Sequence, residues 1–474
     1  MQHIIKKQII DLTLHKKMDA FAVQHLMSER YWQEIVPVLQ KAFDSASTEG
    51  EMIYIDNLEI DLGILYLKDI ERGRWNEEVY KKISEQLNFV SAGNFSDKKV
   101  KKRSLILSSA DQWIFYMGHG YLPWNLLDIN RSWNQKVLEA FASDSVAISK
   151  LRFLISTDPA ALNRIVYQHS KEYLEALVET LTAEKQSGLS KYIDEIAEVL
   201  LFFNQLNKDQ FGKKQLVQKL WFQVFHVSAT AEGIWNPSNF IVHLLKCNIR
   251  DIVLINKLPR YFFSKSRLTA PILKQVKNRE IEIEKIDYSP DLPKEETVEI
   301  ESKISINDEG IFIQYAGIVL LHPFLPMLFK NLQFIKENSF IDEFSHQKAM
   351  FLLHYMATGS TTPEEHELVI EKILCAWALE KPVNNLIQIS LNEQKEADGL
   401  LIEVIQRWEI LKKTSFAGLR EGFLQRNGKL YTKNNDLHLQ IESGAIDMLL
   451  DHLPWNLSLI KLPWMNDILR VDWR

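Results

Sequence analysis

The spacing of apolar residues predicts a helical start to the chain. Between residues 3 and 43, apolar side chains recur every three to four positions, and Pro37 is expected to mark a break or a new helix start. From Leu58 to Leu62 the pattern changes to an alternation of apolar and acidic residues, which is typical of a half-buried strand with an acidic outer face. A further helix is predicted over residues 76–89.

Residues 105–275 are predicted to be helical throughout, because Leu-Leu, Phe-Phe and Ile-Val doublets recur at helical spacing. Proline lacks a backbone N–H and clashes with the preceding turn, so each proline in this region is expected to separate two helices. These prolines are Pro123, Pro159, Pro237 and Pro259. No internal repeat of fixed period is found, which argues against a solenoid of a named type.

The last part of the chain is predicted to hold helices at 345–357, 363–379 and 392–412, followed by a β-hairpin whose strands flank residues 433–436. The most apolar stretch, residues 315–329, is too short to span a membrane and is interrupted by two prolines. The fold class predicted is therefore mainly α with small β elements (α+β), built of many helices in several domains and not inserted in a membrane.

Two polar stretches suggest domain boundaries. The first holds the basic run Lys98–Arg103, and the second is rich in Lys and Glu, with Pro290, Pro293 and a single aromatic residue, Tyr288. The predicted organisation is an N-terminal helix and strand domain (1–92), a basic linker (93–104), a helical middle region (105–275), a charged linker (276–306) and a C-terminal helical domain with a terminal hairpin (307–474).

Composition and charge narrow the possible partners. The 474 residues carry a net charge of -6, so nothing draws the whole chain toward nucleic acid, and the basic run has no interleaved aromatic residues. Only two cysteines occur, which excludes a disulfide framework and indicates a reducing compartment. The N-terminus lacks the apolar core and cleavage site of a signal peptide, so we expect a cytoplasmic location.

The search for chemistry gives no catalytic, metal or cofactor site. His366-Glu367 would begin a zinc-protease motif, but the second histidine that the motif requires is replaced by Ile370. Cys375 has the neighbours of a small core residue, and Glu59 with Asp61 fit a solvated strand face better than an acid–base pair. The glycine clusters at 118–120 and 72–74 do not match a phosphate-binding loop. We therefore expect a protein that is not an enzyme and needs no cofactor.

Three Leu-Pro-Trp triplets, which begin at Leu122, Leu453 and Leu462, are the most unusual local feature. Proline fixes the backbone and tryptophan supplies a large rigid apolar group, so each triplet either attaches a loop to its own core or presents an anchor to a partner. The candidate interaction residues are Trp124, Trp455, Trp464 and Trp473. Of these, Trp455 is expected to point inward and Trp464 to be more exposed.

Several blocks of sequence resemble the tape-measure family of contractile injection systems, which are phage-tail-like particles of bacteria that drive an inner tube through a target membrane. The blocks at the start of the chain are residues 39–43, 55–63 and 120–124. Those toward its end are residues 316–326, 366–369 with 373–375, 414–426, 451–455 and 460–465. The middle, residues 130–300, matches only by position and helical character.

The resemblance implies a structural role in fixing the length of tube and sheath during assembly, with inner-tube, cap or baseplate proteins as partners and self-association as a further option. It also implies assembly in the cytoplasm and incorporation into the particle. From the charge and the hydropathy of the chain we expect no nucleic acid as a partner and no membrane insertion. A continuous helix of the whole chain would reach about 700 Å, which the prolines and glycines forbid. A cap, plug or baseplate-docking component therefore stays an alternative, and a delivered cargo or toxin enzyme a remote one.

Overall fold

The computed structural model divides the chain into two compact units, Met1–Asp111 and Gln112–Arg474. They are called unit 1 and unit 2 below. The structure describes residues 3–5, 8–46, 51–71, 75–91, 100–126, 129, 131–207, 212–231, 233–249, 255, 257–264, 268–278, 310–434 and 436–473. All but the first three residues of the charged linker predicted at 276–306 lie outside this part of the chain, and so do residues 93–99 of the basic linker.

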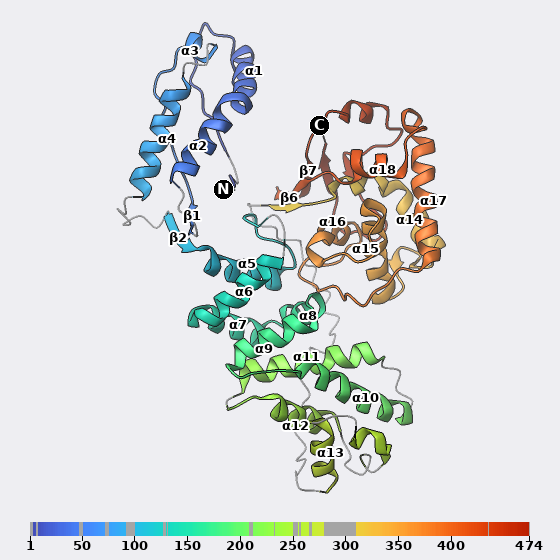
Figure 1. Ribbon diagram of the computed structural model, residues 1–474. Coiled ribbons are helices and arrows are strands. Elements are labelled where there is room, and N and C mark those ends of the chain that lie inside the picture. The colour runs from blue at the N-terminus through green and yellow to red at the C-terminus, as the bar shows by residue number, and fades with distance from the viewer. Residues whose placement is uncertain are drawn as a thin grey trace. The chain divides into compact units, whose positions relative to one another are not determined.

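Unit 1 is a small helical unit with one antiparallel pair of strands (Figure 1). Its elements are α1 (Ala20–Arg30), a π-helical turn (Tyr31–Ile35), α2 (Val36–Ala46), β1 (Glu51–Ile55), α3 (Leu67–Glu71), α4 (Asn76–Ser91), β2 (Val100–Ser104) and the start of α5 (Leu105–His119). The Asp19 carboxylate caps α1 by accepting from the backbone N–H groups of Phe21 and Ala22. The core lies mainly between α1, α2 and α4 and includes Trp75 and Ile83.

The sequence-based predictions for unit 1 are partly wrong. The described residues before α1 are not helical, although a helix was predicted from residue 3. Residues 58–62 form no strand. The strand in this region is β1, which lies earlier and pairs with β2, at the end of the predicted basic linker. The alternation there is real, however. Leu58, Ile60 and Leu62 pack against the helical core, while the acidic residues between them face solvent.

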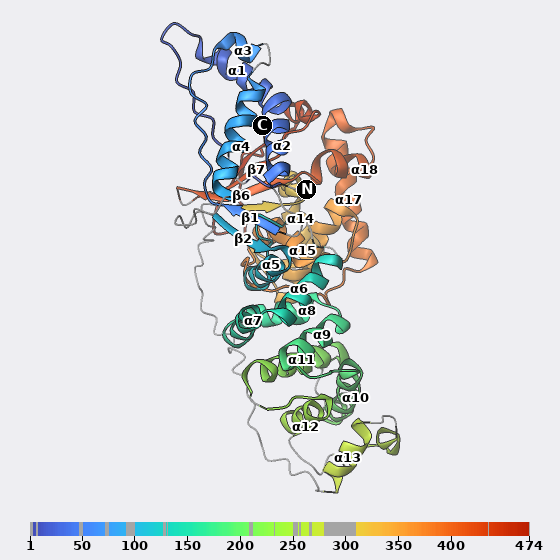
Figure 2. The same ribbon diagram turned by 60° about the vertical axis from the view of Figure 1, so that its left-hand side comes forward.

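The first part of unit 2 is a stack of short helices, which Figures 1 and 2 show following one another along the chain. They are α6 (Arg131–Ser143), α7 (Ser145–Thr157), α8 (Pro159–Gln168), α9 (Lys171–Thr182), α10 (Leu189–Asn207), α11 (Lys213–Thr230), α12 (Pro237–Asn248), a 3₁₀ turn (Arg260–Phe263) and α13 (Thr269–Lys277). Pro159 and Pro237 start helices as predicted, each preceded by a capping Asp158 or Asn236.

The second part of unit 2 surrounds a mixed five-stranded sheet with helices. Its helical elements are a 3₁₀ helix (Ala316–Phe324), α14 (Leu325–Asn331), α15 (Glu343–Thr358), a 3₁₀ turn (Glu365–Leu368), α16 (Val369–Leu374), α17 (Leu391–Arg407), a 3₁₀ turn (Glu409–Leu411), α18 (Phe416–Leu419), a π turn (Arg420–Leu424) and a 3₁₀ helix (Asp447–His452). The helices predicted at 345–357, 363–379 and 392–412 thus correspond to α15, α16 with the turn before it, and α17 with the turn after it.

The sheet has the strand order β3-β6-β7-β9-β8. The strands are β3 (Ile311–Ile313), β6 (Gly428–Lys433), β7 (Asp436–Ile441), β8 (Leu459–Ile460) and β9 (Leu469–Asp472), and a separate short pair joins β4 (Ile335–Lys336) to β5 (Ser339–Phe340). β6 and β7 form the predicted hairpin, and β7 pairs in parallel with β9. Alternate residues of β7 and β9 are buried, so the sheet turns one face to the core. The mainly helical fold with small sheets is as predicted.

Candidate functional site

A buried cluster of charges joins the stack of helices to the second part of unit 2. It consists of Arg164 on α8, Glu365 at the start of the 3₁₀ turn before α16, and Lys372 on α16, with side chains that are at most 1% exposed. Glu365 Oε1 accepts from Arg164 Nε at 3.0 Å and from Lys372 Nζ at 2.6 Å. One carboxylate therefore binds two cations, one seven residues away in the sequence and the other 201 residues away. We call these three residues the charge cluster.

Backbone carbonyls accept hydrogen bonds from both terminal nitrogens of Arg164 and from the ammonium group of Lys372. The Arg164 guanidinium donates to the carbonyl oxygens of Met117 and Glu380, the second at 2.6 Å. The Lys372 ammonium donates to those of Leu379 and Lys381, at 2.8 and 3.0 Å. Burial lowers the pKa of Lys372, and the neighbouring Glu365 carboxylate opposes that shift. Four carbonyl dipoles and the negative charge of one carboxylate thus replace the water molecules that would otherwise solvate the two cations.

Gly120 closes the cluster on the side of α5. Its backbone has a φ of +79°, and a Cβ there would lie 2.9 Å from Arg164 Nη2, from Glu365 Oε1 and from the Leu379 carbonyl oxygen. Only a residue without a side chain fits between these three polar groups. The block Gly120–Trp124 therefore begins beside the charge cluster, and the block that starts at His366 directly follows Glu365.

Amides extend this junction along α8 and α11. Gln168 Oε1 accepts from the backbone N–H of Glu365 at 3.2 Å, and its Nε2 donates to the Val383 carbonyl at 3.0 Å. On α11, the amide of Gln218 donates to the Asn384 side chain at 3.1 Å, and a bond in the opposite direction measures 3.3 Å. Residues 365–384 are thus bound to α8 and α11 by the amide side chains of Gln168 and Gln218. Each of these amides both donates and accepts a hydrogen bond at the junction.

The junction predicts a specific result for limited proteolysis. Protease is expected to cut first between residues 276 and 306, and the two resulting pieces are expected to elute together from a native sizing column. Denaturing electrophoresis would show the cut, and elution in 2 M NaCl would show whether the buried contacts resist screening. First cuts inside 311–460, or pieces that separate at once under native conditions, would contradict the prediction.

The four candidate interaction tryptophans all contribute to unit 2. Trp455 Nε1 donates to the Leu320 carbonyl at 3.0 Å, and Trp464 Nε1 donates to the Leu374 carbonyl at 2.8 Å. Both rings are partly buried, and that of Trp464 packs against Phe329 and Phe340. Trp473 is 7% exposed, and Trp124 is partly buried. These contacts favour attachment of each tryptophan to its own core, and a role in binding a partner stays a prediction for all four.

Both cysteines and several histidines are held in their neutral forms by burial. Burial raises the pKa of Cys247 to about 11 and that of Cys375 well above its usual value, so both thiols stay protonated at neutral pH. Burial also lowers the pKa of His169, His346 and His354 to about 4, which leaves these imidazoles neutral. His366 lies at the start of a helical segment, as expected for a residue shortly after Pro363.

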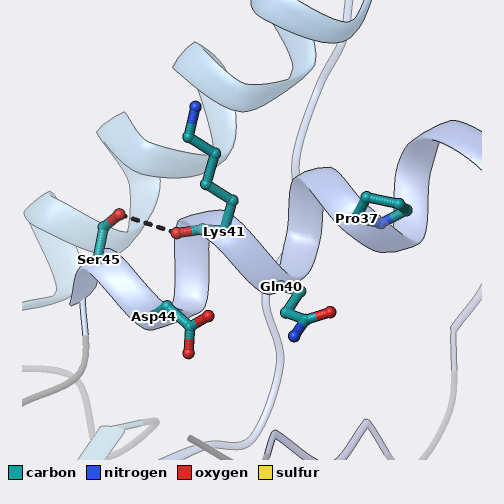
Figure 3. Close-up of a pocket in the computed structure, with 5 residues that line it drawn as sticks. All are labelled: Pro37, Gln40, Lys41, Asp44 and Ser45. Carbon is teal, nitrogen blue, oxygen red and sulfur yellow. Dashed lines mark hydrogen bonds between the residues drawn. The ribbon is translucent and has the colours of Figure 1, made fainter.

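A shallow pocket on α2 offers little for binding chemistry. Figure 3 shows its five lining residues, Pro37, Gln40, Lys41, Asp44 and Ser45, all on one helix. A hydrogen bond from His3 lowers the pKa of Asp44, so this carboxylate is already bound within the chain. Among the described residues, no group of three His, Cys, Asp or Glu side chains could hold a metal ion. In the same part of the chain, no helix has the length and apolarity needed to cross a membrane.

Sequence reasoning missed the charge cluster. Its one local signal is Lys372, which together with Glu371 separates Ile370 from Ile373 and occupies a helix position that should face the core. A lysine there requires a buried acceptor, but its identity depends on the three-dimensional fold.

These features define a mainly helical protein in which buried charges join distant parts of one chain. Comparison with protein families identifies the group: the model of the contractile injection system tape measure protein family matches residues 2–473. The chain belongs to this family. No curated protein and no solved structure gives a significant match.

Proposed function

We propose that the chain acts as a non-catalytic component that associates with the inner tube of a contractile injection particle and sets the length of tube and sheath. Membership of the family gives it a structural tape-measure role, and the match over residues 2–473 is the observation that carries the proposal. Its partners are the inner-tube, cap or baseplate proteins of the particle. Assembly takes place in the cytoplasm, before the chain is incorporated.

No helix in the described part of the chain approaches the length of a ruler made of one helix. The longest continuous helical stretch among the described residues runs from Ala20 to Ala46 and measures about 40 Å, against about 700 Å for the whole sequence. Length control in this conformation therefore depends on how folded units, or copies of the chain, are arranged along the tube. The buried charge cluster and the amide contacts hold the parts of unit 2 together, and such a unit also suits the alternative role of a cap, plug or baseplate-docking component.

A deletion distinguishes these two roles. Removal of residues 237–277, which contain α12 and α13, is expected to shorten particles in electron micrographs, because it shortens the chain without touching the charge cluster. Mass spectrometry of purified particles would show that the variant is incorporated. A matched variant, in which a Gly/Ser linker of equal length replaces the deleted residues, is expected to give particles as short as the deletion does, because the linker restores the number of residues but not the folded helices. Incorporated variants that leave the length unchanged would contradict the ruler role and favour a cap or plug.

A further inference from the structure

Unit 1 exposes nearly as many large apolar side chains as it buries. Its core cluster holds nine large buried hydrophobic residues and Ala42, and nine large hydrophobic residues are exposed in the described part of the unit. The exposed ones are Ile5, Ile9, Ile10, Leu12, Met18, Phe21, Trp32, Ile64 and Tyr66. Single exposed apolar residues are normal on protein surfaces, whereas several on one face mark an interaction surface.

Two of the exposed aromatic residues lie on one face of α1 and the turn after it. Phe21 is 82% exposed and Trp32 is 72% exposed. They are eleven residues apart, and an α-helix turns by about 100° per residue. Eleven residues therefore bring the helix to within about 20° of three full turns, so both side chains project from the same side. Val23 and Met27 are buried on the opposite side. His25 and Ser28, both exposed, lie between the two aromatic residues on the outer side. We call Phe21, His25, Ser28 and Trp32 the α1 stripe.

The π-helical turn separates the α1 stripe from the core. The buried positions Met27 and Ile35 are eight residues apart, whereas an α-helix returns to the same face after seven. The wider turn at Tyr31–Ile35 takes up the additional residue, so α2 continues to bury Leu39 while Trp32 keeps facing outward. Such insertions in helices are often found at functional sites.

The N-terminal segment widens this apolar surface. Tyr31 donates its hydroxyl to Gln8 Oε1 at 2.7 Å, and its ring meets that of Trp32 edge to face at 5.1 Å. Ile9, which follows Gln8, is 66% exposed. The surface around Trp32 therefore includes side chains from two separate segments of unit 1.

The chemistry of the α1 stripe suits a second copy of this chain. The stripe contains no Asp, Glu, Lys or Arg, so its own four side chains bring no like charges together, and the exposed Glu29 lies at its edge. A two-fold axis between His25 and Ser28 would place Phe21 against Trp32 of the second copy, and by symmetry the contact would occur twice. With Ile9, these aromatic residues offer about 500 Å² per copy, a large share of the ~800 Å² per partner in a stable interface.

We propose that the α1 stripe is a self-association surface through which two copies of the chain pack with their α1 helices antiparallel. Paired aromatic residues at each end of the contact provide specific edge-to-face or offset stacking, and Ser28 lets the two helices approach closely near the axis. The contact forms between copies of this chain, so a test with the purified protein is independent of the length-setting role proposed above.

The test measures the oligomeric state of the full chain by analytical ultracentrifugation from roughly 1 to 100 µM, around the affinity expected for an interface of this size. The unchanged chain is expected to show a monomer–dimer equilibrium. Phe21→Glu and Trp32→Lys, made separately, are each expected to weaken the dimer at least about tenfold. The control is Phe153→Glu, since Phe153 is a 68% exposed aromatic residue on α7 and lies outside the stripe. Circular dichroism would confirm that all variants fold.

A mixture of the two variants tests the antiparallel arrangement. In a mixed dimer, the new glutamate would face the new lysine, and the second contact would keep its original Phe21 and Trp32. The mixture is therefore expected to associate more tightly than either variant alone. A chain that stays monomeric at every concentration would overturn the proposal, as would variants that dimerise as well as the unchanged chain. A mixture no tighter than its components would overturn the antiparallel pairing.

Discussion

Replacing Glu365 by alanine is expected to lower the free energy of unfolding of the full chain by about 3–5 kcal/mol. The change leaves the side chains of Arg164 and Lys372 buried at 0% and 1% exposure without the one carboxylate that they share. Breaking a buried ion pair from one side costs more than the pair contributes, because the remaining charges stay desolvated. Urea unfolding followed by circular dichroism would measure the effect.

Glu343 provides a matched control for this prediction. It forms an ion pair with Lys381 at 3.3 Å in the same unit, but both side chains are nearly half exposed. Solvent screens such pairs, so Glu343→Ala is expected to change the free energy of unfolding by less than about 1 kcal/mol. Equal effects of the two substitutions would show that the charge cluster does not stabilise unit 2. Glu365→Ala is also expected to let the two proteolytic pieces separate, which Glu343→Ala should not do.

The charge cluster shows why part of the site was not predictable from the sequence. Apolar periodicity places Arg164 and Lys372 on helices, and the prediction of a mainly helical fold needs no more than that. The pairing of Arg164 with Glu365 depends on a contact across 201 residues, for which no local pattern exists. The sequence shows Gly120 as a glycine near a Leu-Pro-Trp triplet. The reason why this position requires glycine is found only in the fold, which places three polar groups where a Cβ would lie.

Local sequence patterns predict structure most reliably where an element forms from residues close together in the sequence. The hairpin of β6 and β7 has alternating apolar residues on both sides of a polar turn, and it was predicted at the correct place. The alternation at 58–62 was misread because a single extended chain on a helical surface also buries every second side chain. The π-helical turn at Tyr31–Ile35 adds one residue to a helical turn. A pattern that accepts apolar residues every three or four positions does not reveal such an insertion.

A methyl group at Gly317 is expected to prevent the second part of unit 2 from folding normally. Gly317 is buried in the 3₁₀ helix Ala316–Phe324, and a Cβ built on it would lie 1.8 Å from the carbonyl oxygen of Phe423. The obstacle is backbone, so no side-chain rotation can relieve the overlap, and the two segments must move apart. They are also joined by a hydrogen bond of 2.7 Å from the Ala316 N–H to the Arg426 carbonyl.

For Gly317→Ala we therefore expect a loss of more than about 4 kcal/mol of unfolding free energy, or a chain that accumulates in the insoluble fraction. The measurements are soluble yield and the midpoint of thermal unfolding. Gly399→Ala is the matched control, because Gly399 lies on an exposed position of α17 with open space where its Cβ would be. That change should stabilise the chain by about 0.5–1 kcal/mol, since alanine favours a helix over glycine. A Gly317→Ala variant with the yield and midpoint of the unchanged chain would show that the 3₁₀ helix and the π turn at Arg420–Leu424 are not held in direct backbone contact.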